Sequence, residues 1–241
     1  MRKYVFGPLG MQDTTADLGR VTDLLTGHTV FFGKPVPWRM ERFFPNRVNN
    51  EARWGNLSAG FVLSTAHDMG IYLQHYLNDG VPKVPDGGYQ DGWFRDGDRL
   101  FHAGSLEGYS SFMMLLPKLG IGVVILTNMQ DYVGNTMSGL QIEAGIVDIL
   151  AGRQPPPVDR GLYWRRHGLL SVLYLIIMAL PLVRCRHKTI WNVVLPTALL
   201  SLPRVAKARW ATVWGFAPNL LVSLVVSATL LYARWFATKT R

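Results

Sequence analysis

Residues 102–128 are HAGSLEGYSSFMMLLPKLGIGVVILTN, and three short apolar runs follow one another here. Leu100–His102 leads into a glycine-containing corner, Ser110–Leu116 is rich in Phe, Met and Leu, and Ile121–Thr127 is dominated by Val and Ile. The turn sequence Pro117-Lys118-Leu119-Gly120 separates the last two runs. Runs of this length between turn signals predict adjacent antiparallel strands that are buried on both faces. We therefore expect these strands to form the centre of a globular domain.

Helical patterns lie on both sides of these strands. Thr65 and Asp68 have the spacing of a capping box, and Asn78-Asp79-Gly80 is a stop signal. Between them, apolar residues repeat at helical spacing: Met69, Tyr72, Leu73, Tyr76 and Leu77. A second helix is predicted from Asn135 or Thr136 to Ala151, ended by Gly152. Residues 27–58 show little periodicity apart from a possible strand at His28–Phe32, so the fold class we expect is α+β, an antiparallel sheet with flanking helices.

Composition limits the classes of function. The net charge of the 241 residues is +9, and the Lys and Arg residues cluster from Arg153 onward, where they flank apolar segments. Basic residues in that position favour contact with anionic lipid, and no zinc-finger spacing or aromatic-and-basic RNA motif predicts a nucleic-acid partner. The single cysteine, Cys185, excludes an internal disulfide and a cysteine-based metal site. No histidine and carboxylate set, phosphate loop or dinucleotide fingerprint is present, so we expect neither a metal nor a cofactor.

Three apolar stretches follow a linker that contains three consecutive prolines. They are Gly168–Val183, Ile190–Leu202 and Thr212–Ala233. Since a spanning helix needs about 20 apolar residues, the third qualifies, the first is borderline and the second is short. Aromatic residues near their ends favour membrane helices over the alternative, buried core helices of a soluble domain: Trp191, Trp210, Trp214, Tyr232 and Trp235.

These patterns predict three regions. Residues 1–152 form the globular domain, 153–166 a Pro/Arg-rich linker, and 167–241 a membrane region with two or three transmembrane helices. If the first span exits inward, six basic residues lie on the inner side and seven on the outer, so the positive-inside rule does not decide the orientation.

Several patches of the sequence resemble, in the right order, the serine β-lactamase and penicillin-binding-protein-like hydrolases. They are PLGM (8–11) with Thr14, AGFVLSTAHDM (59–69) with YLNDG (76–80), Tyr89-x-x-Gly92-Trp93, HAGSLEGYSS (102–111) and IGVVILTN (121–128). The resemblance covers Phe6 to Gly152, although the loop Val81–Asp91 is shorter here than in most of the family. It implies a partial β-lactamase/transpeptidase-like fold, because PLGM falls in the middle of the family's catalytic domain. Such a fold would expose a sheet edge, and we expect marginal stability or an upstream polypeptide that completes it.

The resemblance also implies site residues. In this family a Ser-x-x-Lys serine attacks a carbonyl, and a strand with a Lys-Thr-Gly or His-x-Gly motif forms the far wall of the active site. On that pattern His102 handles a proton or binds a substrate carboxylate, and Gly104 lets the substrate backbone approach. The backbone N–H of Ser105 would be an oxyanion donor. The alternative for His102 is a strand-end histidine with a structural hydrogen bond.

The nucleophile motif itself is missing. No serine in the chain has a lysine three residues later, the nearest patterns being Ser64-x-x-His67 and Ser201-x-x-Arg204. Tyr76-Leu77-Asn78 spells the family's Tyr-x-Asn, but it lies where the family has a helix terminus. We therefore expect no acyl-enzyme from this chain alone.

The expected function is that of the C-terminal portion of a membrane-anchored serine hydrolase. It would act by acyl transfer or hydrolysis on an amide or ester: a D-amino-acid peptide, a β-lactam or a small ester. The expected location is the cell membrane, multi-pass, with the globular part outside, and the expected partners are the lipid bilayer and that substrate. One alternative is a catalytically silent membrane module that binds peptide or cell-wall fragments. Another is that the basic helical tail is the working part.

Overall fold

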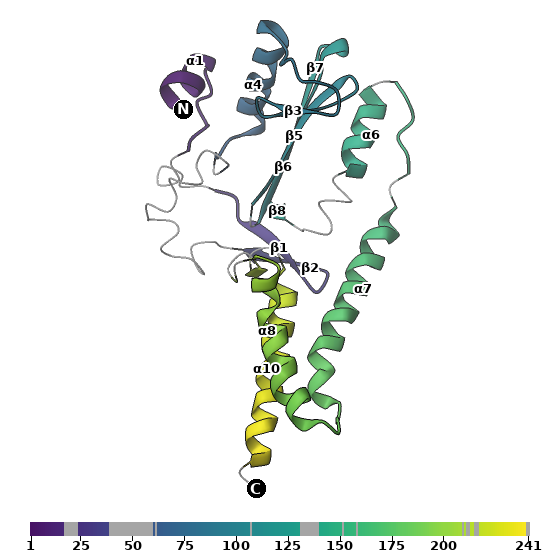
Figure 1. Cartoon of the computed structure of the whole chain (residues 1–241). Helices are drawn as coiled ribbons and strands as arrows, with labels where there is room; N and C mark the ends of the chain where they lie inside the picture. The colour runs from purple at the N-terminus through teal and green to yellow at the C-terminus, as the bar shows by residue number, and fades with distance from the viewer. Residues whose placement is uncertain are drawn as a thin grey trace. The chain divides into compact units, whose positions relative to one another are not determined.

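The computed structural model describes residues 1–16, 24–38, 60, 62–106, 108–130, 140–150, 152–157, 159–208, 210, 213–214 and 217–239 (Figure 1). The chain divides into two compact units. The first contains Met1–His28 and Pro37–Gln130, and the second contains Thr29–Val36 and Asp131–Arg241. Antiparallel sheets and helices in succession make the fold α+β, as the sequence predicted.

The first unit is built on a five-stranded antiparallel sheet with the order β3-β4-β5-β6-β7. The strands are β3 (Tyr89–Gln90), β4 (Trp93–Asp96), β5 (Arg99–Leu106), β6 (Tyr109–Leu116) and β7 (Ile121–Thr127). The three strands predicted from the apolar runs are thus confirmed. The corner expected at 102–105 was wrong, because these residues pair with β6 and β5 continues to Leu106. Leu115 pairs with Leu100 on one side and with Gly122 on the other. The turn between β6 and β7 is a 3-10 helix, η4 (Pro117–Leu119), closed by Gly120 at φ 66°.

Burial on both faces holds for β6 only. Met114 and Leu115 are consecutive, point to opposite faces and are both fully buried. In β7 every described position is half-buried or exposed, and Leu126 is 41% exposed. The prediction was wrong for β7 because, among the described strands, it is the last of the sheet and has a strand neighbour on one side only.

Helix α4 (Ala66–Asp79) has the predicted ends. The Thr65 hydroxyl accepts a hydrogen bond from the Asp68 backbone N–H at 3.2 Å, and Gly80 follows the last residue. The Asp68 carboxylate is buried, and its Oδ2 accepts hydrogen bonds from Asp13 N (2.8 Å) and Thr14 Oγ1 (2.7 Å). These contacts fasten the N-terminal segment, which contains η1 (Arg2–Phe6) and α1 (Gly7–Leu9), to the start of α4.

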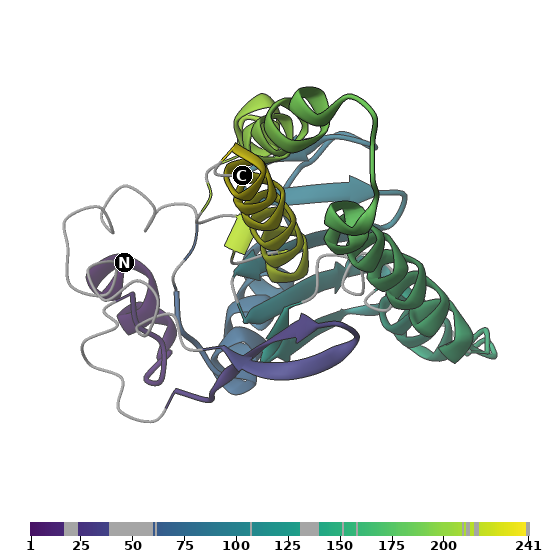
Figure 2. The ribbon, with the colours of Figure 1, turned by 90° about the horizontal axis from the view of Figure 1, so that it is seen from below.

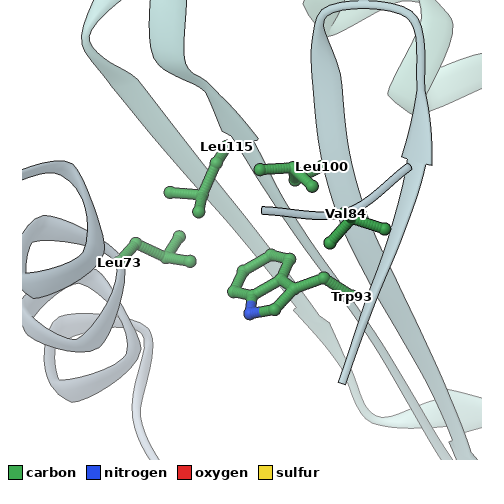
Figure 3. Packing of buried hydrophobic residues seen from close by; sticks show 5 residues of the cluster. All are labelled: Leu73, Val84, Trp93, Leu100 and Leu115. Carbon is green, nitrogen blue, oxygen red and sulfur yellow. The ribbon is translucent and has the colours of Figure 1, made fainter. Parts of the chain in front are cut away.

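The core of this unit lies between α4 and the sheet (Figure 3). Its buried members are Leu73, Val84, Trp93, Leu100 and Leu115. Burying each large apolar side chain stabilises the fold by about 1.5–3 kcal/mol. Leu73 approaches β7 where Gly122 has no side chain, because a Cβ on Gly122 would lie 2.8 Å from the Leu73 Cβ.

The chain also forms a hairpin of β1 (Gly27–Phe31) and β2 (Lys34–Trp38), which Figure 2 shows as a two-stranded ribbon. With β8 (Met129–Gln130) the strand order is β2-β1-β8. Phe32 and Gly33 at its tip have φ values of 46° and 78°, as a tight two-residue hairpin turn requires. The strand predicted at His28–Phe32 is confirmed, but β2 was missed, because its two prolines do not indicate a strand. The rest of the stretch expected to be irregular, 39–58, lies outside the described residues.

Helix α6 (Leu140–Leu150) ends at Gly152, which has φ 71°. Its predicted start at 135 or 136 lies outside the described residues. The following helix, α7 (Arg160–Ala179), begins inside the stretch that we assigned to the linker, so the linker is shorter than expected. The reason is the Asp159 side chain, which accepts hydrogen bonds from Leu162 N (3.0 Å) and from the Arg165 guanidinium (2.7 Å). The Arg165 guanidinium also holds the pKa of the Asp159 carboxyl below its ordinary value.

The C-terminal helices correspond to the three predicted apolar stretches. After α7 come η6 (Leu180–Leu182), η7 (Ile190–Val194), α8 (Leu195–Val205) and α10 (Pro218–Lys239). Two segments, Trp164–Leu182 and Pro218–Thr238, are long and apolar enough to cross a membrane by length and composition. Ile190–Val205 is apolar but shorter.

Helices α7 and α10 run side by side in the same direction. The hairpin tip contacts both near their starts: the Phe32 N–H donates to Asn219 Oδ1 at 3.2 Å, and Gly33 approaches the ring of Trp164. At their other ends, Arg234 Nη1 donates to the carbonyl oxygens of Pro181 (3.0 Å) and Val183 (2.8 Å).

Helix α10 buries polar side chains together with the apolar residues Leu224, Ala228 and Leu231. Asn219, Ser223 and Ser227 recur every four residues on α10, and all three are buried. On α7 a stripe at helical spacing is exposed and apolar: Leu169, Val172, Leu173 and Ile176.

We predict opposite effects of two glycine-to-alanine substitutions. Gly122→Ala lowers the free energy of unfolding by about 1–3 kcal/mol, because the new methyl group overpacks against Leu73. Gly70→Ala raises it by about 0.5–1 kcal/mol, because Gly70 lies inside α4 with open space around it. Urea unfolding of the full chain in detergent, followed by tryptophan fluorescence, measures both. Equal effects of the two variants would contradict the packing described.

Candidate functional site

The strand that carries the predicted site residues is paired along only half of one edge. β6 pairs with β5 from Leu100 to Leu106, whereas β4 pairs with β5 only from Arg99 to Phe101. Within the described residues, the edge of β5 that faces away from β6 therefore has no strand partner from His102 to Leu106. Alternate residues of an unpaired edge direct their backbone N–H and C=O groups outward, where another extended chain can bond to them.

The turn at the end of β5 is held from outside the five-stranded sheet. The Gly108 carbonyl accepts a hydrogen bond from His28 N at 3.1 Å, and the Tyr109 hydroxyl donates to the Leu25 carbonyl at 2.6 Å. Gly108 has φ 86°, and a Cβ there would lie 3.2 Å from the Gly27 Cα and 3.3 Å from a Trp38 ring atom. Only glycine fits both this backbone conformation and this space.

His102 lies at the start of the unpaired edge. Its half-buried ring lies 6.0 Å from the ring of Phe94 and 6.1 Å from that of Tyr89, both of which are partly exposed. Among the described residues the imidazole has no hydrogen-bond or ion-pair partner. The structural hydrogen bond of the alternative interpretation is therefore absent from this part of the chain.

Gly104 and Ser105 follow on the same edge. Gly104 pairs with Ser111 of β6, and a Cβ at Gly104 would collide with the Ser111 hydroxyl. Ser105 is exposed and pairs with Ser110, whose hydroxyl bonds to Thr127 and to the Met129 carbonyl. The structure thus brings His102, Gly104 and Ser105 together on one open strand segment.

Two features of this site were missed from the sequence. One is the open edge, for which the signal was the Asp91-Gly92 turn, because it makes β4 begin at Trp93, opposite the middle of the eight-residue β5. The other is Ser111, whose place opposite Gly104 follows only from the register of β5 and β6. No cluster of three metal-ligating side chains occurs among the described residues.

Comparison with known proteins assigns the domain to a family. The Beta-lactamase family model matches residues 1–140, which is more than half of the chain, and the chain belongs to the Beta-lactamase family. The β-lactamase-like fold implied by the sequence patches is thereby confirmed. Whether His102, Gly104 and Ser105 have the roles inferred for them stays a prediction.

Similar proteins share only part of their length with this chain. Protein flp of Staphylococcus aureus, in strain NCTC 8325 / PS 47 and in strain COL, is 38% identical over 58 residues, which are 23% of this chain and 12% of the relative. The octameric penicillin-binding protein homologue from Pyrococcus abyssi is 21% identical with a TM-score of 0.45, over 71% of this chain and 41% of that one. The chain therefore corresponds to a minor share of the length of these proteins.

We predict that the β5–β6 turn is sensitive to a single methyl group. Gly108→Ala lowers the free energy of unfolding by about 1–3 kcal/mol more than Gly97→Ala, because both residues have positive φ but only Gly108 is crowded. Denaturant unfolding of the two full-length variants gives the difference. Equal losses would show that backbone strain alone, without the contacts to Gly27 and Trp38, accounts for the glycine.

Proposed function

We propose that this chain is the C-terminal portion of a membrane-anchored serine hydrolase of the β-lactamase/penicillin-binding type. Its part in the reaction is to bind the acyl substrate along His102–Leu106. The observation that carries this proposal is the half-paired β5, which presents the His102-Ala103-Gly104 sequence on an open edge in a domain of the Beta-lactamase family. The substrate class is an amide or ester: a peptide with D-amino acids, a β-lactam or a small ester.

The open edge suits an extended substrate. A peptide that adds to the edge of a strand gains backbone hydrogen bonds without using any side chain of the strand. Gly104 leaves the substrate room, and the imidazole of His102 is free of described partners, so it can exchange a proton or bind a carboxylate. The backbone N–H of Ser105 is assigned to the substrate oxyanion, because a backbone donor costs no reorganisation when charge develops.

The serine and its lysine must come from a polypeptide segment other than those in this sequence, since no Ser-x-x-Lys occurs in it. A segment that completes the fold has a place to bind. Within the described residues, β7 has a strand neighbour on one side only, and its other edge is open to pairing. This segment is the polypeptide partner that we propose.

The missing motif favours one alternative, a catalytically silent module. Such a module would keep the substrate-binding edge of β5 and recognise peptide or cell-wall fragments without cleaving them. The two functions share the binding step and differ in the acyl-enzyme.

The membrane part of the proposal rests on the helical unit. We propose that α7 and α10 span the cell membrane in a multi-pass arrangement with the globular domain on the extracytoplasmic side. The exposed apolar stripe of α7 and the buried Asn219, Ser223 and Ser227 of α10 support this, because helices in lipid place polar groups between helices and apolar groups outside.

Substrate binding is tested with a tripeptide that ends in D-alanyl-D-alanine. We expect saturable binding to the full chain in detergent, and we expect Gly104→Val to weaken it at least tenfold, because the added side chain collides with the Ser111 hydroxyl and displaces the β5 edge. Gly70→Val, inside α4 where a Cβ meets nothing within 4 Å, is the control and leaves the affinity unchanged. Absence of saturable binding, or equal loss in both variants, would overturn the proposed function.

Covalent labelling separates the enzyme from the silent module. Neither a fluorescent penicillin nor a fluorophosphonate should label any serine of the purified chain, because an unactivated serine hydroxyl is a weak nucleophile. The DNA read in frame ahead of the Met1 codon gives the complementary result. A Ser-x-x-Lys and a Tyr-x-Asn encoded there favour the enzyme, and a stop codon without them favours the silent module.

Membrane anchoring is tested by extraction. Membranes that contain the chain should retain it after an alkaline carbonate wash and release it with detergent, as expected of helices that span rather than lie on the bilayer. A chain that the carbonate wash releases does not span the membrane.

A further inference from the structure

A pocket lies at the end of the sheet opposite to the β5–β6 turn. Its volume is about 450 Å³, within the range of small-molecule sites. The loop 81–85, Arg95 and Asp98 at the β4–β5 turn, and Pro117 and Lys118 of η4 form its walls. Leu100, at the start of β5, lies in its lining, and at about 3.3 Å per residue it is about 17 Å along the strand from Ser105. The pocket is thus separate from the candidate substrate edge.

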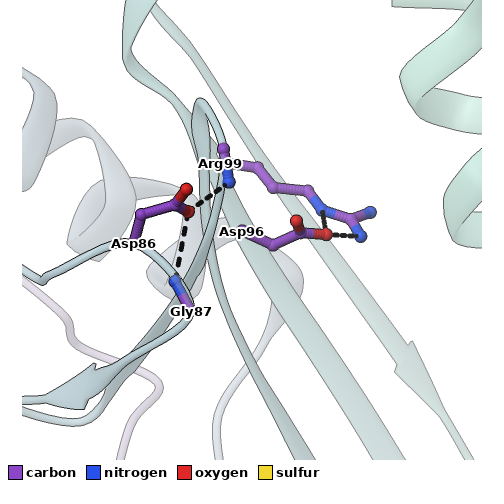
Figure 4. Close-up of polar contacts among 5 residues, drawn as sticks. Asp86, Gly87, Asp96 and Arg99 are labelled. Carbon is purple, nitrogen blue, oxygen red and sulfur yellow. Dashed lines mark hydrogen bonds and ion pairs between the residues drawn. The ribbon is translucent and has the colours of Figure 1, made fainter.

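The rim of this pocket is held in place by hydrogen bonds between the loop and the β4–β5 turn. Asp86 Oδ1 accepts from Gly87 N (3.1 Å) and from Gly97 N (2.8 Å), as Figure 4 shows together with the neighbouring pair of Asp96 and Arg99. The loop and β4 also exchange backbone hydrogen bonds, from Gly87 N to Arg95 O (3.1 Å) and from Arg95 N to Gly88 O (3.0 Å). The pocket is therefore preformed, so that a ligand does not have to order it.

The floor of the pocket is apolar. Val84 and Leu100 are both buried and belong to the cluster around Trp93. Pro82, Pro85 and Pro117 add rigid apolar walls that lose little entropy when a ligand binds. An apolar group of a ligand can therefore be removed from water here.

The charged groups at the mouth are mostly cationic. Lys83, Arg95 and Lys118 line the pocket with a single carboxylate, Asp98, which Lys118 contacts at 2.7 Å. Arg95 donates to the carbonyls of Val84 (3.1 Å) and Gly97 (3.0 Å), and three of its five N–H groups remain without a described partner. The Lys83 ammonium has no partner among the described residues. Lys118 is neutralised by Asp98, so Lys83 and Arg95 remain as two cations that favour an anionic ligand.

We propose that this pocket binds a small carboxylate that carries a compact apolar group. The apolar group rests on Val84 and Leu100, and the carboxylate lies between Lys83 and the remaining N–H groups of Arg95. Planar guanidinium and carboxylate groups match in geometry, which favours a carboxylate over other anions of the same charge. This site does not depend on the proposed hydrolase function, and it would exist equally in a silent module.

The test uses 3-phenylpropionate as the probe and the full chain in nanodiscs of zwitterionic lipid. Methyl NMR of Val and Leu residues follows the titration, with 3-phenylpropanol and 3-phenylpropylamine as neutral and cationic analogues. We expect saturable shifts at Val84 and Leu100 with the carboxylate, and at least threefold weaker binding of both analogues.

Charge variants give effects of opposite sign. Lys83→Gln weakens binding of 3-phenylpropionate about threefold, whereas Asp98→Asn strengthens it about threefold, as expected for one unit charge near the mouth of a solvated pocket. Lys34→Gln, which removes an exposed lysine of β2, leaves the affinity unchanged. All three substituted residues are exposed, so the fold is retained, and an unchanged unfolding transition verifies this.

Three results would overturn the proposal. One is binding of the alcohol or the amine that equals or exceeds that of 3-phenylpropionate, which would show that the carboxylate does not contribute to binding. Another is a set of shifts centred on residues 102–106, which places the probe on the substrate edge. The last is the same change in affinity for Lys83→Gln, Asp98→Asn and Lys34→Gln. That result would show that the affinity for 3-phenylpropionate does not depend on the charges at the pocket.

Discussion

The contact between Leu73 of α4 and Gly122 of β7 governs the globular part of this protein. Because Gly122 has no side chain, the helix packs directly on the backbone of the sheet, and Leu73 becomes one of the most deeply buried residues. The other buried residues of the cluster gather around this contact from β4, β5, β6 and the loop before β3. The start of α4 is fixed separately by the hydrogen bonds of Asp68 to Asp13 and Thr14. Helix, sheet and N-terminal segment are thus bound to one another through α4.

A second constraint is the unequal length of two neighbouring strands. β4 has four residues and β5 has eight, so β4 covers only the first half of β5. At the covered end, the turn between the two strands bonds to the loop 81–88 and encloses the apolar pocket. At the uncovered end, His102, Gly104 and Ser105 lie on an edge that no described strand pairs with. One difference in length therefore produces both surfaces at which we propose that small molecules bind.

The sequence predicted the features that depend on local signals. The three core strands follow from apolar runs and turn residues, and α4 follows from its capping box and terminal glycine. The early start of α7 is not evident from the sequence, because three prolines shortly before Asp159 indicate a linker rather than a helix cap. The exposure of β7 could not be predicted, because an edge strand and a central strand with the same apolar run differ only in their neighbours. Pairing register likewise decides that Ser111 faces Gly104, and the pocket arises from loop contacts between residues far apart in the chain.

If α7 and α10 both span a bilayer, as we propose, their parallel course has a consequence for the segment between them. The hairpin tip contacts both helices near their starts, and Arg234, near the end of α10, bonds to carbonyl groups just beyond the end of α7. Two parallel helices that both span a bilayer need a return passage between them, and η7 with α8 is the segment available. These elements have 5 and 11 residues, which at about 1.5 Å per residue give a return path about 24 Å long. The hydrocarbon core of a bilayer is about 30 Å thick, so this path is too short to cross it. A bilayer crossed in this way would thin locally around the return segment, and the protein would bind best to thin membranes.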